Sequence, residues 1–136
     1  MLFRSGRLVP DSVRRQLHYA HRRRVPWGVS ESAFYHFNQE GHYQYRAFGV
    51  PGLGLKRSLG ERVVIAPYAS LLALPIAPRE VESNVVRFTE LGMLGRYGLY
   101  EAIDFSARGD GDAPRGSPVR AYMSHHQGMK IGRAHV

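Results

Sequence analysis

The chain has 136 residues, 43% of them apolar, and its 19 Lys and Arg outnumber its 11 Asp and Glu, which gives a formal charge of +8. This composition favours one small folded domain over a disordered chain, and the absence of cysteine excludes disulfides and thiolate metal sites. The longest apolar run, from Leu71 to Ala77, is too short to span a bilayer and no signal peptide is visible, so we expect no targeting or transmembrane segment.

The first predicted element is a helix from Ser12 to Arg23, with Asp11 as its N-cap. Apolar residues recur on one face at helical spacing: Val13, Leu17 and Ala20. The opposite face carries arginines, and Arg22–Arg24 forms the one true basic cluster. Such clusters can bind nucleic acid. A solvated helix face explains this one better, so we expect no nucleic-acid partner.

No period is visible from Trp27 to Gly60, where glycines alternate with aromatic residues. Long irregular segments inside compact domains are usually functional or disordered. Disorder fits poorly with so many aromatic side chains, so we predict a loop region that faces a ligand. A phosphate-binding loop is disfavoured within it, because Leu55 and Arg57 interrupt the required Gly-Lys-Ser spacing. We interpret the run from Gly49 to Ser58 as a tight turn.

The second half of the chain alternates predicted helices and loops. The run from Val63 to Ala66 is a strand or the start of a buried helix, and a helix follows from Pro67 to Leu74. A second helix begins at Pro78 and stops at Gly92. Its apolar residues repeat at helical spacing: Val81, Val85, Phe88 and Leu91.

An aromatic loop is predicted from Gly95 to Phe105, and a polar turn region from Ala107 to Gly116. Ser117 and Pro118 then resemble an N-cap and first helical residue, which predicts a helix through His126. The pattern therefore predicts an all-α fold. It consists of helical hairpins whose long, aromatic-rich loops gather at one end.

Three segments hold candidate chemistry. Glu31 lies between two serines after a Pro-Trp-Gly sequence, where hydroxyl donors and nearby arginines favour the ionised carboxylate. Glu101 lies among Tyr, Leu, Ile and Phe residues, an apolar setting that favours the protonated form, as an acid catalyst requires. Asp104 follows three residues later and could orient Glu101 or substitute for it. Two carboxylates with contrasting environments are the equipment of glycosidic-bond chemistry.

His125 and His126 form the third segment. Adjacent residues on a helix point about 100° apart, and the position four residues after His125 is Met129. A metal site is therefore not expected, and we expect no cofactor. Hydrogen bonding to sugar hydroxyls and a purely structural role both fit these histidines.

Five motifs follow one another in order: PWGVSESAF, YQYRAFGVPGLGLKRSL, VVIAPYASLLAL, GRYGLYEAIDF and VRAYMSHHQGM. Together they resemble the glycoamylase-like domain found in cyclic β-1,2-glucan synthases, over residues 12–129. The resemblance implies a partial (α/α) toroid that acts on β-1,2-glucan, by a transglycosylation that closes the ring or by hydrolysis. In the parent synthases, it implies fusion to a membrane-embedded glycosyltransferase domain and a phosphorylase-like domain, on the cytoplasmic side of the bacterial inner membrane. We expect this segment to make no direct membrane contact.

The resemblance assigns site residues position by position. Glu31 and Glu101 match the family's acidic positions, and their surroundings suggest Glu31 as nucleophile or base and Glu101 as acid. A retaining mechanism would place the two carboxyl groups about 5–5.5 Å apart, and a wider gap implies inversion. The remaining matched residues are expected to contact substrate: Trp27, Tyr43, Tyr45, Arg57, Tyr97, Tyr100, His125, His126 and Gln127.

Two alternatives from other classes remain open. The first is a non-catalytic glycan-binding module, which would keep the aromatic contacts without turnover. The second is a basic nucleic-acid-binding protein, whose affinity would fall steeply with salt, whereas sugar stacking would not.

Both ends of the chain match the two orientations of a common sequencing-library adapter. Residues 1–5 and 131–136 are therefore expected to be non-native, with residues 6–130 forming part of a glycoamylase-like domain. Resequencing the source locus tests this expectation, and native codons through both junctions would contradict it. Because a toroid cannot close with so few helices, we also expect the isolated chain to be insoluble or molten, and inactive. A sharp cooperative melt would contradict that expectation.

Overall fold

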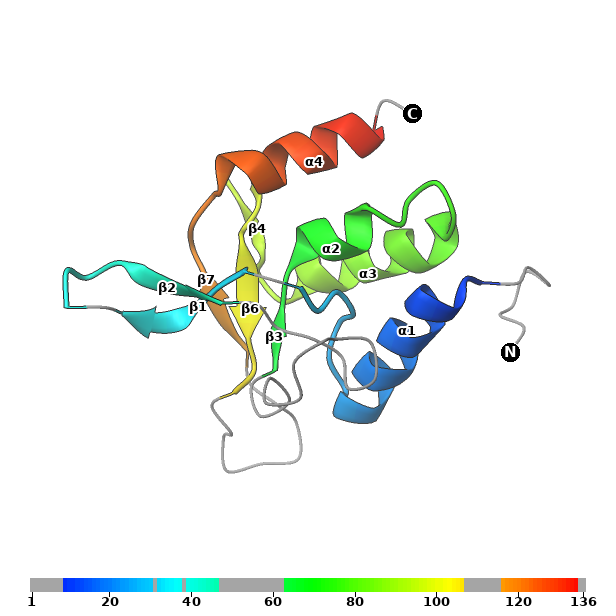
Figure 1. The fold of residues 1–136 in the computed structure, drawn as a ribbon, viewed down its shortest axis with the longest axis horizontal. Helices are drawn as coiled ribbons and strands as arrows, with labels where there is room; N and C mark the ends of the chain where they lie inside the picture. Colours follow the sequence, from blue (N-terminus) through cyan, green and yellow to red (C-terminus); the bar gives the residue numbers. More distant parts are fainter. Residues whose placement is uncertain (1–8, 31, 38, 47–62, 107–115, 135–136) are drawn as a thin grey trace.

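The computed structural model describes residues 9–30, 32–37, 39–46, 63–106 and 116–134 (Figure 1). Within these ranges, helices and short strands are interleaved along the chain. The helices are α1 (Asp11–Arg23), α2 (Pro67–Leu71), α3 (Pro78–Glu90) and α4 (Ser124–Ala134). The strands are β1 (Ser32–Phe37), β2 (Tyr43–Arg46), β3 (Val64–Ile65), β4 (Leu94–Gly95), β5 (Gly98–Leu99), β6 (Ala102–Asp104) and β7 (Ser117–Val119).

The strands pair into three small antiparallel sheets. β1 pairs with β2, β4 pairs with β5, and β6 lies between β3 and β7 in a three-stranded sheet. The prediction of an all-α partial toroid is therefore wrong for the described residues, which form a mixed α and β structure. No helix within these ranges is both long and apolar enough to cross a membrane.

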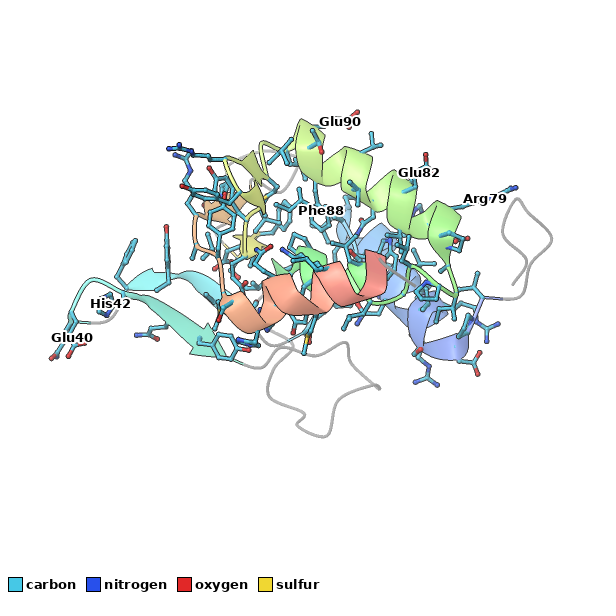
Figure 2. All side chains as sticks on the ribbon, turned by 90° about the horizontal axis from the view of Figure 1, so that it is seen from above. Glu40, His42, Arg79, Glu82, Phe88 and Glu90 are labelled. Carbon is cyan, nitrogen blue, oxygen red and sulfur yellow. The ribbon has the colours of Figure 1, made fainter. Side chains whose placement is uncertain are left out.

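The three-stranded sheet lies at the centre of the molecule (Figure 1). The β1–β2 hairpin extends away from it on one side, and α1 lies on the opposite side. α2 and α3 lie on the same side of the sheet as α1, above it in this view, and α4 passes over α2. The same arrangement is seen from above in Figure 2. Helices therefore gather on one side of the sheet, and the hairpin leaves on the other.

The two long predicted helices are confirmed. In α1, Val13 and Ala20 are buried and Leu17 packs against the core, as the helical spacing indicated. In α3, Val81 and Phe88 are buried. The cap of α1 differs from the prediction. Asp11 is the first helical residue, preceded by Pro10, and it forms an ion pair with Arg14 one turn later. α2 ends at Leu71, three residues before the predicted end.

Three predicted irregular or helical segments form strands instead. The first half of the Trp27–Gly60 loop contains the β1–β2 hairpin, and the predicted loop from Gly95 to Phe105 contains β4, β5 and β6. Aromatic residues suit strands as well as loops, and no clean alternation marks β1, whose register shifts between Phe34 and Phe37. The helix predicted from Ser117 is wrong, because residues Ser117–Val119 form β7 and α4 begins only at Ser124.

The position of Pro118 explains that last error. A Ser-Pro pair suits a helix start, but proline is also tolerated on an edge strand, where its missing N–H faces away from the sheet. β7 is an edge strand of the three-stranded sheet, and Pro118 is paired in register with Ile103 of β6. The local signal fits both structures, and the buried central strand β6 provides the partner that decides between them.

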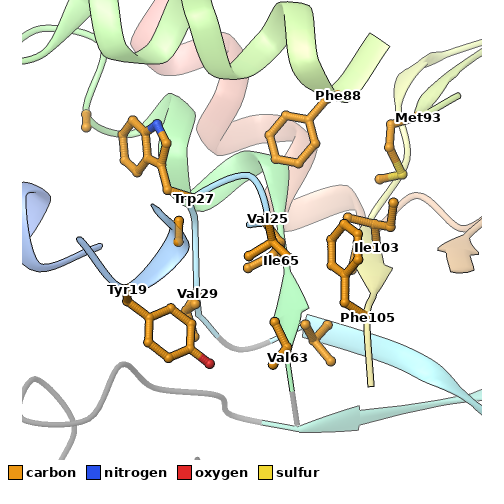
Figure 3. Packing of buried hydrophobic residues seen from close by; sticks show 14 of the residues in the cluster. Tyr19, Val25, Trp27, Val29, Val63, Ile65, Phe88, Met93, Ile103 and Phe105 are labelled. Carbon is orange, nitrogen blue, oxygen red and sulfur yellow. The ribbon is translucent and has the colours of Figure 1, made fainter. Parts of the chain in front are cut away.

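The core is formed where the sheet meets α1 and α3 (Figure 3). Phe88 and Met93 pack from one side, Ile65 and Ile103 from the sheet, and Val25 from the segment after α1. These side chains have almost no exposed surface. Burying large apolar side chains stabilises a fold by about 1.5–3 kcal/mol each. This shared core fixes the sheet and the helices that carry the site.

Gly28 docks the segment after α1 onto the start of α2. The Ala66 amide donates a hydrogen bond to the Gly28 carbonyl at 2.8 Å. Gly28 has a φ of +131°, and a Cβ placed there would lie 2.8 Å from the Ala66 carbonyl oxygen. Only glycine allows both this backbone conformation and this close approach. The contact places Ser30 beside α2.

Candidate active site

Glu101 lies at the short link between β5 and β6. Its amide donates to the Ala121 carbonyl at 2.9 Å, and the preceding Tyr100 amide donates to Met93 at 2.9 Å. The backbone of this link is therefore fixed on both sides. The Glu101 side chain has none of its surface exposed. A carboxyl group this deeply buried requires polar partners, because desolvating it alone is costly.

His126 of α4 is that partner. Its Nδ1 lies 2.7 Å from Oε1 of Glu101, and its own side chain is only 1% exposed. A carboxylate oxygen only accepts hydrogen bonds, so with Glu101 ionised Nδ1–H donates to Oε1. Nε2 lies 3.4 Å from the hydroxyl oxygen of Tyr45 on β2. In that state the hydroxyl can donate to a neutral Nε2, giving a path from Tyr45 through His126 to Glu101.

Two further rings hold His126 in place. The ring of Tyr68, on α2, is stacked on the imidazole with centroids 3.6 Å apart and planes 12° from parallel. His125 lies 4.0 Å away at a tilt of 57°. Stacked rings restrict the plane of the imidazole and therefore the direction of its hydrogen bond to Glu101. Three parts of the chain that are far apart in the sequence therefore meet at this pair: α2, α4 and the link between β5 and β6.

Three buried side-chain polar atoms of the described residues have no hydrogen-bond partner. One is Oε2 of Glu101, the second carboxyl oxygen of the pair. The others are Oγ of Ser32, which follows Glu31 in the chain, and Nε2 of Gln127, which follows His126. Buried polar groups nearly always have partners, so each unsatisfied one indicates water, a ligand or a functional role.

Lys130 lies one helical turn after His126, and its Nζ donates to the Leu99 carbonyl at 3.2 Å. Burial lowers the pKa of Lys130, and attraction to the negative charge of Glu101 opposes this by raising it. Lys130 is therefore a partly buried cationic group whose pKa responds to the charge of Glu101.

Asp104 lies at the end of β6, three residues beyond Glu101. Its Oδ1 accepts a hydrogen bond from the Ser106 amide at 2.8 Å. This contact belongs to the turn that follows β6. The expected role of Asp104, to orient or replace Glu101, stays a prediction.

Tyr97 and Tyr100 form an aromatic cluster with Tyr122 at the β4–β5 hairpin. Tyr122 meets Tyr97 edge-on with 5.7 Å between ring centroids. Its ring lies 5.5 Å from that of Tyr100, at a tilt of 42°. Tyr97 is 70% exposed. The exposed ring of Tyr97 offers a flat surface on which a sugar ring can stack, whereas Tyr100 packs partly against the core. The expected substrate contacts of both residues stay predictions.

The other expected contacts have different surroundings. Tyr43 stacks on Phe37 in the β1–β2 hairpin with 4.7 Å between centroids. Within the described ranges, no three His, Asp or Glu side chains gather to form a metal site around His125 or His126. Glu31, Arg57 and the predicted turn from Gly49 to Ser58 lie outside the described residues, so their roles stay predictions.

Trp27 is buried in the core between α1 and α3. Asn84 holds its backbone on both sides, accepting from the Trp27 amide at 3.1 Å and donating to its carbonyl at 2.7 Å. The indole N–H donates to the Glu80 carbonyl at 3.3 Å. Trp27 also lines a pocket of about 550 Å³ between the two helices, which contains neither Glu101 nor His126. These contacts give Trp27 a structural role, and its expected substrate contact stays a prediction.

Tyr68 and Lys130 are site residues that the sequence reasoning missed. Tyr68 lies within the matched motif VVIAPYASLLAL, from which no residue was selected. Lys130 is four residues after His126, the spacing that places two side chains on one helix face. The helical spacing was a usable signal for Lys130. The contact of Tyr68 with His126 joins residues 58 positions apart and leaves no local signal.

Two comparisons with known proteins bear on this site. The model of the Glycoamylase family, described as "Putative glucoamylase", matches residues 12–133. The cyclic β-(1,2)-glucan synthase NdvB of Rhizobium meliloti (strain 1021) is 44% identical over 119 residues, or 88% of this chain. The chain spans only 4% of the length of that relative.

Proposed function

The chain belongs to the Glycoamylase family, and we propose that it forms part of an enzyme domain that acts on the glycosidic bonds of β-1,2-glucan. The resemblance predicted from its five motifs is thereby confirmed. The family supports carbohydrate chemistry in general. The name of the Rhizobium relative supports β-1,2-glucan as the substrate.

The observation that carries this proposal is the arrangement of the two Glu101 oxygens. Oε1 is held by His126 at 2.7 Å, and Oε2 is buried without a hydrogen-bond partner among the described residues. An acid catalyst needs one oxygen anchored and the other available to carry a proton to the reacting bond. A glycosidic oxygen at Oε2 would also satisfy the unpartnered atom.

The proposed step begins with the proton on Oε2 of Glu101 and with Nδ1–H of His126 donating to Oε1. The proton passes to the glycosidic oxygen as the bond between that oxygen and the anomeric carbon breaks. Glu31 either attacks the anomeric carbon, forming a glycosyl–enzyme bond that breaks when an acceptor deprotonated by Glu101 displaces it, or deprotonates an acceptor that attacks the anomeric carbon directly. An acceptor hydroxyl from a sugar gives transglycosylation, and one from water gives hydrolysis.

Glu101 is fully enclosed in this structure, so substrate reaches it only when a covering side chain moves. We propose that Tyr45 is this side chain. It is 42% exposed, it approaches Nε2 of His126 from β2, and β2 belongs to the hairpin that extends from the body (Figure 2). Rotation of the Tyr45 side chain would open this side while β1, whose Ala33 belongs to the core, stays in place.

The proposed domain is tested in a host chimera, which is the Rhizobium synthase with its matching segment replaced by this chain. Linear β-1,2-glucan and linear α-1,4-glucan are each offered to the host chimera. We expect new products from β-1,2-glucan only, read by mass spectrometry as rings or shortened chains. Turnover of α-1,4-glucan alone, or loss of all activity on exchange of the segment, would contradict the proposal.

We further propose that the parent of this chain joins it to a glycosyltransferase domain and a phosphorylase-like domain at the cytoplasmic side of the inner membrane. The match to a small part of a much longer glucan synthase supports a multidomain parent. Sequencing outward from the source locus tests this architecture. An open reading frame that encodes this segment without a glycosyltransferase domain would contradict it.

A glycan-binding module without turnover is the second candidate. The enclosed side chain of Glu101 and the exposed ring of Tyr97 favour it, because stacking needs an open surface and no free acid. In the host chimera, such a module would bind β-1,2-glucan, and no new product would form from it. A nucleic-acid-binding role would instead produce binding that weakens steeply with salt.

The pKa of Lys130 gives a direct test of the site geometry. Because burial lowers this pKa below its ordinary value of 10.5, acylation of Lys130 in the host chimera should reach half its maximum at a lower pH than acylation of free lysine. The Glu101 charge raises the same pKa, so Glu101→Gln should move the midpoint lower still. Peptide mass spectrometry reads both midpoints. An unchanged midpoint in Glu101→Gln would contradict the coupling.

A further inference from the structure

We infer that Tyr68 is a positioning residue that ties the Glu101–His126 pair to the segment leading into Glu31. The inference rests on the proposed function, because it concerns the same site. Tyr68 contacts His126 with its ring and Ser30 with its hydroxyl, and Ser30 is the residue before Glu31 in the chain. One side chain therefore contacts both His126 of the pair and the residue that precedes position 31.

The first contact fixes the imidazole. The two ring centroids are 3.6 Å apart and nearly parallel, which is a full face-to-face overlap. Rotation of His126 out of this plane would break the overlap and turn Nδ1 away from Oε1 of Glu101, which it now meets at 2.7 Å. Tyr68 therefore acts on Glu101 through His126.

The second contact fixes the segment on the other side. The Tyr68 hydroxyl donates to Oγ of Ser30 at 2.8 Å. The docked backbone of Gly28 lies two residues earlier, where the Ala66 amide donates to its carbonyl at 2.8 Å. Two hydrogen bonds from the start of α2 thus hold the three residues before position 31.

Tyr68 is itself held firmly. It is only 4% exposed, and Pro67 opens α2 with a fixed φ that suits a first helical position. The Ser70 hydroxyl donates back to the Pro67 carbonyl at 2.9 Å, and Ser70 is fully buried. Because this turn is fixed, the Tyr68 side chain can hold His126 and Ser30 in a constant position relative to each other.

The experiment compares Tyr68→Phe, Ser30→Ala and the double variant in the host chimera. Tyr68→Phe keeps the ring stack and removes only the hydroxyl contact. We expect kcat on β-1,2-glucan to fall about tenfold with KM within about twofold, because misplacing a catalytic group lowers the rate without weakening substrate binding. Ser30→Ala should match it. The double variant should be no worse than either single variant, since both remove the same bond.

Tyr68→Leu removes the stack as well, so it should lower kcat further and displace the pH profile of kcat. Tyr19→Phe is the matched control, because it removes the hydroxyl of a buried tyrosine on α1, outside the site, and should leave kcat unchanged. A purely structural role would lower resistance to proteolysis in Tyr68→Phe while leaving kcat of the folded fraction and its pH profile unchanged. That result would overturn the inference.

Additive losses in the double variant, or a kcat within twofold of wild type in Tyr68→Phe, would also overturn it. These outcomes leave the proposed function intact as long as Glu101→Gln is inactive. Full activity in Glu101→Gln would instead remove the proposed function. The two failures are therefore distinguishable in one set of assays.

Discussion

Replacing Glu101 with glutamine should lower turnover of β-1,2-glucan in the host chimera by about 10²–10⁴-fold, the usual contribution of general acid catalysis. The amide keeps the size of the side chain and can still accept from Nδ1 of His126, but it cannot supply a proton. Binding of β-1,2-glucan should stay within about threefold, because ground-state contacts are unchanged. Initial rates and direct binding measure the two effects separately.

Glu82→Gln is the matched control, since Glu82 is exposed on α3 and lies outside the site. It should keep wild-type turnover. A fall in binding that parallels the fall in turnover would show that Glu101 maintains structure rather than donating a proton. Equal, full activity in Glu101→Gln and Glu31→Gln would eliminate the carboxylate mechanism altogether.

Gly28→Ala should destabilise the segment by about 2–5 kcal/mol, the largest stability effect that we expect. The new methyl group would lie 2.8 Å from the backbone oxygen of Ala66, and the residue would keep a φ of +131° that L-residues rarely adopt. Relief requires moving the backbone of residues 28–30 away from α2. Pulse proteolysis of the host chimera, read at peptides from this segment, measures the loss.

Gly41→Ala separates the two causes. Gly41 also has a positive φ, +78°, but nothing lies within 4 Å of a Cβ placed there. It should cost only about 1–2 kcal/mol, the strain of a left-handed backbone alone. Equal losses in the two variants would mean that the contact with Ala66 contributes nothing to stability.

Helices with a long apolar stripe could be predicted from the sequence, and of the short strands only β3 was among the expected alternatives, for residues 63–66. Val13 and Ala20 in α1, and Val81 and Phe88 in α3, recur at helical spacing and are buried as that spacing indicated. β6 has only three residues and is buried on both faces, so it carries no alternation to detect. β3 pairs with residues of β6 that are at least 38 positions away along the chain, and β7 with residues at least 13 positions away. Neither distance falls within a local sequence pattern.

The main residues of the candidate site could be predicted from the sequence, but the contacts between them could not. Glu101 and His126 were selected separately, from an aromatic setting and from a matched motif. Their contact depends on α4 passing over α2 and the central sheet, which the predicted all-α arrangement did not contain. Tyr68 was missed for the same reason, because a buried tyrosine in an apolar helix gives no local indication of chemistry.

The role of Glu101 as proton donor is tested most directly by changing the leaving group of the substrate. The substrate is a β-1,2-linked oligosaccharide with a dinitrophenyl leaving group, and dinitrophenolate departs without protonation. Glu101→Gln should therefore keep its activity on this substrate within about tenfold of wild type while losing activity on β-1,2-glucan. Equal loss on both substrates would contradict the assignment of Glu101 as the acid. Equal retention on both would contradict the proposed site.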